Sequence, residues 1–204
     1  MMKKLFWPAF LVLVFLCSAG LIGYSWMVFQ MSRGVAAARQ GDFETAVATF
    51  ELAETPFRSV PWLSRILNSD YQRLTFEHVN VLFAMGEPET ISDKFEQAVM
   101  SSPTIKDQGE FSFWMGNLLF HRAAASQDGE EALGYLKSAL AEYQRGLAAA
   151  PENWDLKYNY EVIKQIFSKK EKDGKREGER VKSILDKMRP MQEKKQQIAP
   201  EKLG

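Results

Sequence analysis

Apolar side chains recur along this chain at helical spacing, and most of the apolar runs stop at a glycine or a proline. Three runs share one phrase: a small or aliphatic residue, an aromatic residue four positions later, and a small residue three positions after that. The phrases are Ala46, Phe50 and Ala53; Ile91, Phe95 and Ala98; and Ala139, Tyr143 and Gly146. Intervals of three and four place side chains on one face of a helix, so each phrase predicts a helix that packs against a core.

The interruptions between these runs predict a series of helices joined by short turns. Gly41 and Asp42 break a strong helix-forming segment, and Thr55 with Pro56 is expected to end the helix that follows. Pro88 suits the first turn of a later helix, and Asp128 is placed to cap another. We expect helices over residues 36–40, 43–54, 60–68, 70–85, 88–100, 110–126, 130–150 and 154–168. The fold class predicted is therefore all-α.

The N-terminal segment has the properties of a membrane anchor. No charged residue occurs over residues 5–31, and about 20 apolar residues in a helix cross the roughly 30 Å hydrocarbon layer. Trp7, Tyr24 and Trp26 lie near the two ends, where aromatic rings favour the membrane interface. We expect residues 1–32 to form a signal anchor with one transmembrane helix.

A cleaved signal peptide is the competing interpretation of this segment. Ser18, Ala19 and Gly20 offer small residues near a possible cleavage point, but the uncharged run continues through residues 21–29. A retained anchor is therefore favoured. Lysines precede the span and arginines follow it, which gives only a slight preference for orientation. We expect the N-terminus in the cytoplasm and a periplasmic domain on a single-pass bacterial inner-membrane protein, with a cytoplasm-facing adaptor as the alternative.

The charge of the chain changes sharply along its length. Residues 34–163 carry 10 basic and 19 acidic side chains, whereas residues 164–204 carry 13 basic and 7 acidic ones. We expect a helical domain over residues 33–168 and a charged, largely disordered tail over residues 169–204, with a short amphipathic segment at 179–189. The tail has mixed charges and no interleaved aromatics, so nucleic-acid binding is not expected; anionic lipid or an acidic protein remain open.

The three phrases resemble tetratricopeptide (TPR) repeats, which pair helices in units of 34 residues. The phrases start at Ala46, Ile91 and Ala139, so their spacings of 45 and 48 predict insertions around residues 57–69 and 104–130. The resemblance implies antiparallel helical hairpins that bind proteins rather than perform chemistry.

The stretch from Pro151 to Glu161 (PENWDLKYNYE), with the N-terminal span, resembles MxaK-type accessory proteins. Those are membrane-anchored proteins associated with MoxR-type ATPases and von Willebrand factor A (VWA) domain proteins. The resemblance implies a scaffold or assembly factor for a periplasmic or membrane complex, with such proteins as partners. In TPR folds the first helix of each pair lines a concave groove. On that basis, and with the half-covered last helix, the candidate partner-binding residues are Arg73, Asn80, Asn117, Trp154, Lys157, Tyr158 and Asn159.

Catalytic, cofactor and metal sites are not predicted. His78 and His121 are the only histidines, and the one cysteine, Cys17, lies in the apolar N-terminal segment, so no converging ligand set is evident. Asp128, Glu130 and Glu131 do not have the spacing of a calcium loop. The chain has no glycine-rich phosphate loop and no nucleophile elbow. An enzyme with an unrecognised site is the remaining, disfavoured alternative, and no small-molecule substrate is evident.

Overall fold

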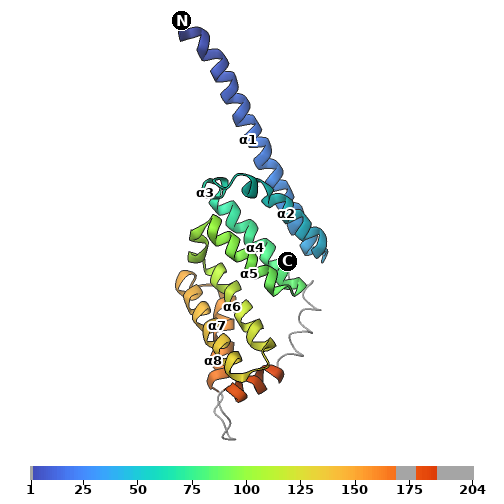
Figure 1. Ribbon diagram of the computed structural model, residues 1–204, viewed down its shortest axis with the longest axis vertical. Coiled ribbons are helices and arrows are strands. Elements are labelled where there is room, and N and C mark those ends of the chain that lie inside the picture. The colour runs from blue at the N-terminus through green and yellow to red at the C-terminus, as the bar shows by residue number, and fades with distance from the viewer. Residues whose placement is uncertain (1, 169–177, 188–204) are drawn as a thin grey trace. The chain divides into compact units, whose positions relative to one another are not determined.

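The computed structural model describes residues 2–168 and 178–187, and these are helical without any strand (Figure 1). The predicted all-α class is confirmed. The expected disorder of the tail concerns residues 169–177 and 188–204, which lie outside the described ranges. The elements are α1 (Met2–Arg39), α2 (Phe43–Ser59), α3 (Leu63–Ile66), α4 (Asn68–Met85), α5 (Pro88–Ser101), the 3-10 helix η1 (Pro103–Asp107), α6 (Gly109–Ala125), α7 (Gly129–Ala149) and α8 (Trp154–Ser168).

Local chemistry accounts for several of these boundaries. Gly41 has φ of 78°, a left-handed conformation that a side chain would strain, so the chain turns there after α1. The Asp42 carboxylate accepts a hydrogen bond from the Thr45 amide at 3.1 Å and caps α2. The Asp128 carboxylate accepts one from the Glu130 amide at 2.8 Å at the start of α7, as the sequence indicated.

The structure departs from the expected ending of α2. Pro56 lies inside α2 rather than ending it, and the helix continues to Ser59. A proline removes one amide donor from the helix, yet its own carbonyl still accepts a hydrogen bond from the Val60 amide at 2.9 Å. Phe57, only 5% exposed, ties the last turn to the core.

The chain forms two compact units, residues 1–81 and residues 82–204, with the boundary inside α4. The expected domain boundary at residue 32 lies within α1, which continues unbroken from the apolar segment to Arg39.

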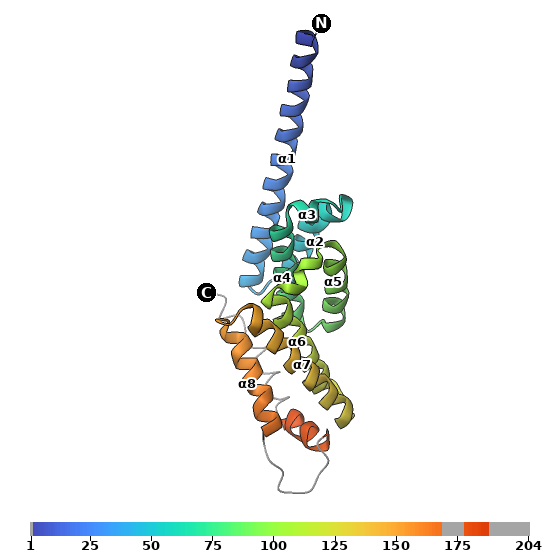
Figure 2. The same cartoon turned by 90° about the vertical axis from the view of Figure 1, so that its left-hand side faces the viewer.

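Unit 1 is built on the antiparallel hairpin of α1 and α2. The C-terminal third of α1 packs against α2 through Met27 and Met31, which are buried. A Cβ atom on Gly34 would lie 2.6 Å from the Phe50 ring, so α1 has room for this ring only because residue 34 is glycine. The preceding part of α1 extends away from the hairpin (Figures 1 and 2). By length and composition the segment Phe10–Arg39 could cross a membrane, a test that N-terminal signal sequences also pass.

Unit 2 contains a second hairpin, α6 with α7, and α8 packed on it (Figure 2). Here a Cβ atom on Gly116 would lie 2.4 Å from the Tyr143 ring, which repeats the glycine-aromatic packing of unit 1. The helical segment at 178–187 adds Val181 and Leu185 to the same buried cluster as Leu136 and Ile163. This segment overlaps the stretch at 179–189 that the sequence indicated as amphipathic.

The two hairpins differ in length beyond their glycine–aromatic contacts. Gly34 and Phe50 are 16 positions apart, whereas Gly116 and Tyr143 are 27 apart. Residues 104–130, where an insertion was expected, consist mostly of α6, the first helix of this longer hairpin. The buried cluster that includes Val181 and Leu185 extends into this lengthened part, through Ala123 and Ala132.

Candidate functional site

A groove of about 380 Å³ lies on one side of α1 in unit 1. Five of its lining residues fall at helical spacing on α1, and a sixth continues the same face just past the helix end. The lining residues are Met31, Ser32, Val35, Ala36, Arg39, Gln40 and Arg73. Arg73 is the member supplied by α4, so the groove needs α1 and α4 held at a fixed separation.

The groove is apolar along its floor and basic at its rim. Met31, Val35 and Ala36 supply the apolar surface, while Arg39 and Arg73 are exposed. Among the described residues, no carboxylate lines the groove and none forms an ion pair with either arginine. Guanidinium groups with free donors bind carboxylates by charge-assisted hydrogen bonds, often in pairs. The groove therefore suits an extended segment that carries an acidic group.

A buried polar pair fixes α4 against α2 behind this groove. His78 Nδ1 on α4 lies 3.0 Å from Glu54 Oε1 on α2, and the two side chains are 3% and 9% exposed. The Phe50 ring lies 5.7 Å from the imidazole. Buried polar groups need such partners because burying them without a hydrogen bond is costly. The pair thus holds α4, and with it Arg73, at one position beside the α1–α2 hairpin.

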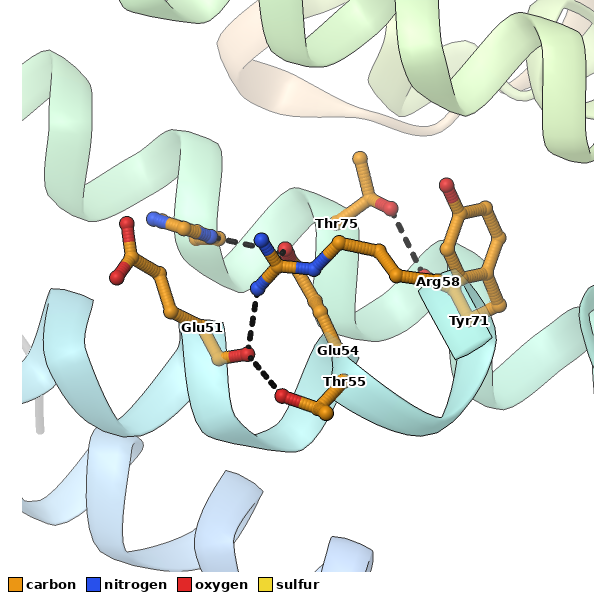
Figure 3. Close-up of polar contacts among 7 residues, drawn as sticks. Glu51, Glu54, Thr55, Arg58, Tyr71 and Thr75 are labelled. Atoms are coloured by element: carbon orange, nitrogen blue, oxygen red, sulfur yellow. Dashed lines mark hydrogen bonds and ion pairs between the residues drawn. The ribbon is translucent and has the colours of Figure 1, made fainter. Parts of the chain in front are cut away.

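Arg58 lies next to Glu54 on α2, as Figure 3 shows. Its guanidinium lies 4.0 Å from Glu54 and donates a hydrogen bond at 2.7 Å to the Glu51 carbonyl oxygen. The side chain of Arg58 is 59% exposed, so its attraction to Glu54 is screened by water. His78 was not expected to belong to a metal site, and no local pattern in the sequence indicated its partner Glu54, 24 positions away.

Two of the predicted partner-binding residues, Asn117 on α6 and Asn159 on α8 of unit 2, form hydrogen bonds within the protein. Asn117 Oδ1 accepts hydrogen bonds from the Tyr143 hydroxyl at 2.7 Å and from Asn159 Nδ2 at 2.9 Å. Burial raises the pKa of Tyr143 well above its ordinary value, an effect that its hydrogen bond with Asn159 partly opposes. Asn117 and Asn159 therefore join α6, α7 and α8 to one another, a role the sequence did not indicate.

The start of α8 presents the other predicted residues to solvent. Trp154 and Tyr158, one helical turn apart, are 78% and 62% exposed. The Lys157 ammonium lies 5.3 Å from the centroid of the Trp154 ring and 3.5 Å from the Glu152 carboxylate. Cation–π contact of this kind orders an exposed ring.

The predicted site residues thus fall into separate groups. Arg73 lines the groove, and Asn80 is half-buried two turns further along α4 in the same unit. The groove wall on α1, above all Arg39, was not among the predicted site residues. The signal was present as small and apolar residues at i, i+1, i+4 and i+5 from Met31.

Comparison with known proteins identifies the fold. No protein-family model and no curated protein sequence matches the chain. The solved structures that are similar include "First TPR of Spaghetti (RPAP3) bound to HSP90 peptide SRMEEVD", with a TM-score of 0.51 and 15% identity over 71% of this chain and 97% of that one. They also include the NMR structure of the first TPR domain of the human RPAP3 protein, with a TM-score of 0.50 and 16% identity over 69% of this chain and 91% of that one. At such identities the likeness shows a TPR-like fold, which confirms the resemblance at that level.

Proposed function

We propose that this protein is a non-catalytic, membrane-anchored protein-interaction scaffold that holds an acidic segment of a partner protein in the groove between α1 and α4. The observation that carries the proposal is that Arg39 and Arg73 both line a groove with an apolar floor, and that no carboxylate from the described part of the chain lines it. A TPR domain of similar fold is described as bound to an HSP90 peptide, SRMEEVD, which is rich in acidic residues. That likeness supports a peptide ligand of this chemical type here.

The anchor in this proposal is the first part of α1. Residues 10–26 are exposed along the helix although most of them are apolar, and large exposed apolar surfaces mark sites of protein or membrane contact. Anchoring would confine the scaffold and its partners to one surface, which raises their effective concentration.

The resemblance to MxaK-type proteins supports a narrower version of the proposal. In that version the scaffold faces the periplasm and assists assembly or maturation of a membrane or periplasmic complex, with VWA-domain or MoxR-associated proteins as partners. Fusion of alkaline phosphatase after Gly204 in a bacterial host tests the orientation. Phosphatase activity is expected; fluorescence from a cytoplasmic reporter at the same position, without that activity, would favour a cytoplasm-facing adaptor.

Binding in the groove is tested by a photo-crosslinking residue placed in the full-length protein in its native membrane. Ala36, on the groove floor, is the test position, and Ala48, exposed on α2 outside the groove, is the matched control. We expect discrete covalent adducts from position 36 and none from position 48. Arg73→Glu should abolish the adducts, whereas Lys137→Glu, the same charge change on α7, should preserve them.

Two results would oppose the groove as the binding site. One is the absence of any adduct from position 36 while position 48 gives one. The other is an adduct from position 36 that survives Arg73→Glu undiminished, because the ligand would then not depend on the basic rim.

A further inference from the structure

The α3 segment lies at a definite height along α1. Helix α2 runs back along α1, and its 17 residues extend about 25 Å at 1.5 Å per residue. Measured back from Arg39, that length ends close to Tyr24. A direct contact agrees, because the Tyr24 hydroxyl lies 3.4 Å from Asp70 Oδ2 at the start of α4. In both views α3 lies at the end of the hairpin from which α1 emerges (Figures 1 and 2).

Tyr24 marks the height at which the α1 anchor would leave the hydrocarbon layer. Counted from Leu5, the first residue after the lysines, about 20 helical residues cross roughly 30 Å, which ends at Tyr24. Tyr24 and Trp26 are 39% and 41% exposed there, and amphipathic rings favour the headgroup region. The α3 segment is therefore level with the membrane interface.

The α3 segment carries exposed apolar side chains at this height. Trp62 is 58% and Ile66 is 69% exposed, one helical turn apart, although both are large and apolar. Arg65 is exposed beside them, and Pro61 precedes them. We call Pro61, Trp62, Arg65 and Ile66 the α3 patch. An aromatic ring, an aliphatic side chain and a cation together match the composition of segments that lie in the interface plane.

We propose that the α3 patch inserts into the headgroup region of the same bilayer that α1 crosses. The proposal rests on the proposed membrane anchor. Two observations select lipid over a protein partner: the patch is level with the interfacial aromatics of α1 through the Tyr24–Asp70 contact, and its charged member is a cation, which anionic headgroups attract. The protein then meets the bilayer at two points, and the second point fixes the tilt of the hairpin relative to the membrane.

Depth-dependent fluorescence quenching tests this placement in the full-length protein. Cys17 is the single cysteine, so a Cys17→Ser background accepts one labelled cysteine at a time. A nitrobenzoxadiazole label is attached at Leu13→Cys in the span, at Ile66→Cys in the α3 patch, or at Ala48→Cys on α2. The protein is reconstituted in phosphatidylglycerol–phosphatidylcholine vesicles that contain spin-labelled lipid.

We expect strong quenching of the label at positions 13 and 66 and no quenching at position 48. Adding Trp62→Ser to Ile66→Cys should reduce the quenching at position 66, while the quenching at position 13 remains. An unquenched position 13 would overturn the anchor and the inference together. Quenching at 13 without quenching at 66, or equal quenching at 66 and 48, would leave the anchor standing and overturn the α3 patch.

Discussion

The α1–α2 hairpin of unit 1 and the α6–α7 hairpin of unit 2 share a glycine–aromatic contact but differ in the polar groups buried beside it. In each, an aromatic ring on the second helix lies against a glycine on the first: Phe50 on Gly34 in unit 1, and Tyr143 on Gly116 in unit 2. Phe50 has no polar atom, and the buried polar pair beside it belongs to Glu54 and His78. Tyr143 carries its own hydroxyl, which Asn117 accepts.

The difference shows that the glycine–aromatic contact holds the two helices of each hairpin together, while the buried polar groups determine which further helices pack on the hairpin. In unit 1 the polar pair joins α2 to α4 and so positions the groove arginine Arg73. In unit 2 the hydroxyl and two asparagines join three helices. The Glu54–His78 pair and the Tyr143–Asn117–Asn159 group each satisfy buried polar atoms by hydrogen bonding. In unit 1 the helix that carries His78 also supplies the groove residue Arg73.

The largest expected effect concerns the part of the unit 2 core that the segment 178–187 supplies. Leu185→Ala removes a side chain that is 1% exposed in the cluster shared with α7 and α8, and should lower the free energy of unfolding of unit 2 by about 2–5 kcal/mol. Hydrogen exchange along α7 measures it. Lys187→Ala, at an exposed neighbouring position, is the control. Equal exchange rates in the two variants would show that segment 178–187 does not stabilise the hairpin.

The glycine-aromatic contact itself is tested by adding one methyl group. Gly34→Ala and Gly116→Ala place a Cβ atom 2.6 Å and 2.4 Å from the facing ring, and should each destabilise their unit by about 1–3 kcal/mol through overpacking. Gly134→Ala, on α7 with nothing within 4 Å, should instead stabilise by roughly 0.5–1 kcal/mol because alanine favours a helix. Denaturant unfolding distinguishes the signs; three equal shifts would refute the packing argument.

The polar pair of unit 1 gives the next test. Glu54→Ala removes the carboxylate that faces the buried His78 imidazole, and should cost about 1–3 kcal/mol because a buried ring nitrogen loses its partner. The rate of hydrogen exchange of the backbone amides in α2 should rise accordingly. Arg58→Ala serves for comparison, because an exposed ion pair contributes about 0–1 kcal/mol. If Arg58→Ala lowered the free energy of unfolding more than Glu54→Ala, the Glu54–His78 pair would not be the contact that fixes α4.

The smallest expected effect comes from removing the Tyr143 hydroxyl in unit 2, and the pH dependence of this effect gives a second test. Tyr143→Phe should cost about 1 kcal/mol near neutral pH through its lost hydrogen bond to Asn117. Burial raises the pKa of Tyr143 in the folded state, so the wild type loses stability as pH rises above about 10, where the unfolded chain releases the proton. The variant lacks this loss. The difference in the free energy of unfolding between the wild type and the variant should therefore shrink as pH rises above about 10. A difference that stays constant from neutral pH to above that value would contradict the prediction.

Local features of this fold could be predicted from the sequence, and distant pairings could not. The expected bounds of α8 coincide with Trp154–Ser168, and the turn at Gly41 follows from glycine chemistry alone. The expected ending at Pro56 was wrong because burial of Phe57 outweighs one lost hydrogen bond. The pairing of Asn117 with Asn159 spans 42 positions, and no local pattern encodes which helices meet. The groove wall on α1 escaped prediction because the same residues continue an apolar anchor segment.

The unbroken course of α1 has a consequence for orientation. A single helix connects the apolar N-terminal stretch to the wall of the groove, so the two are locked in rotational phase. Deleting one residue near Gly23 would turn the groove by about 100° around the helix axis and shift it by about 1.5 Å. Deleting seven would nearly restore its original heading, short by about 20°. The direction in which the groove faces is thus encoded by the number of residues in this helix.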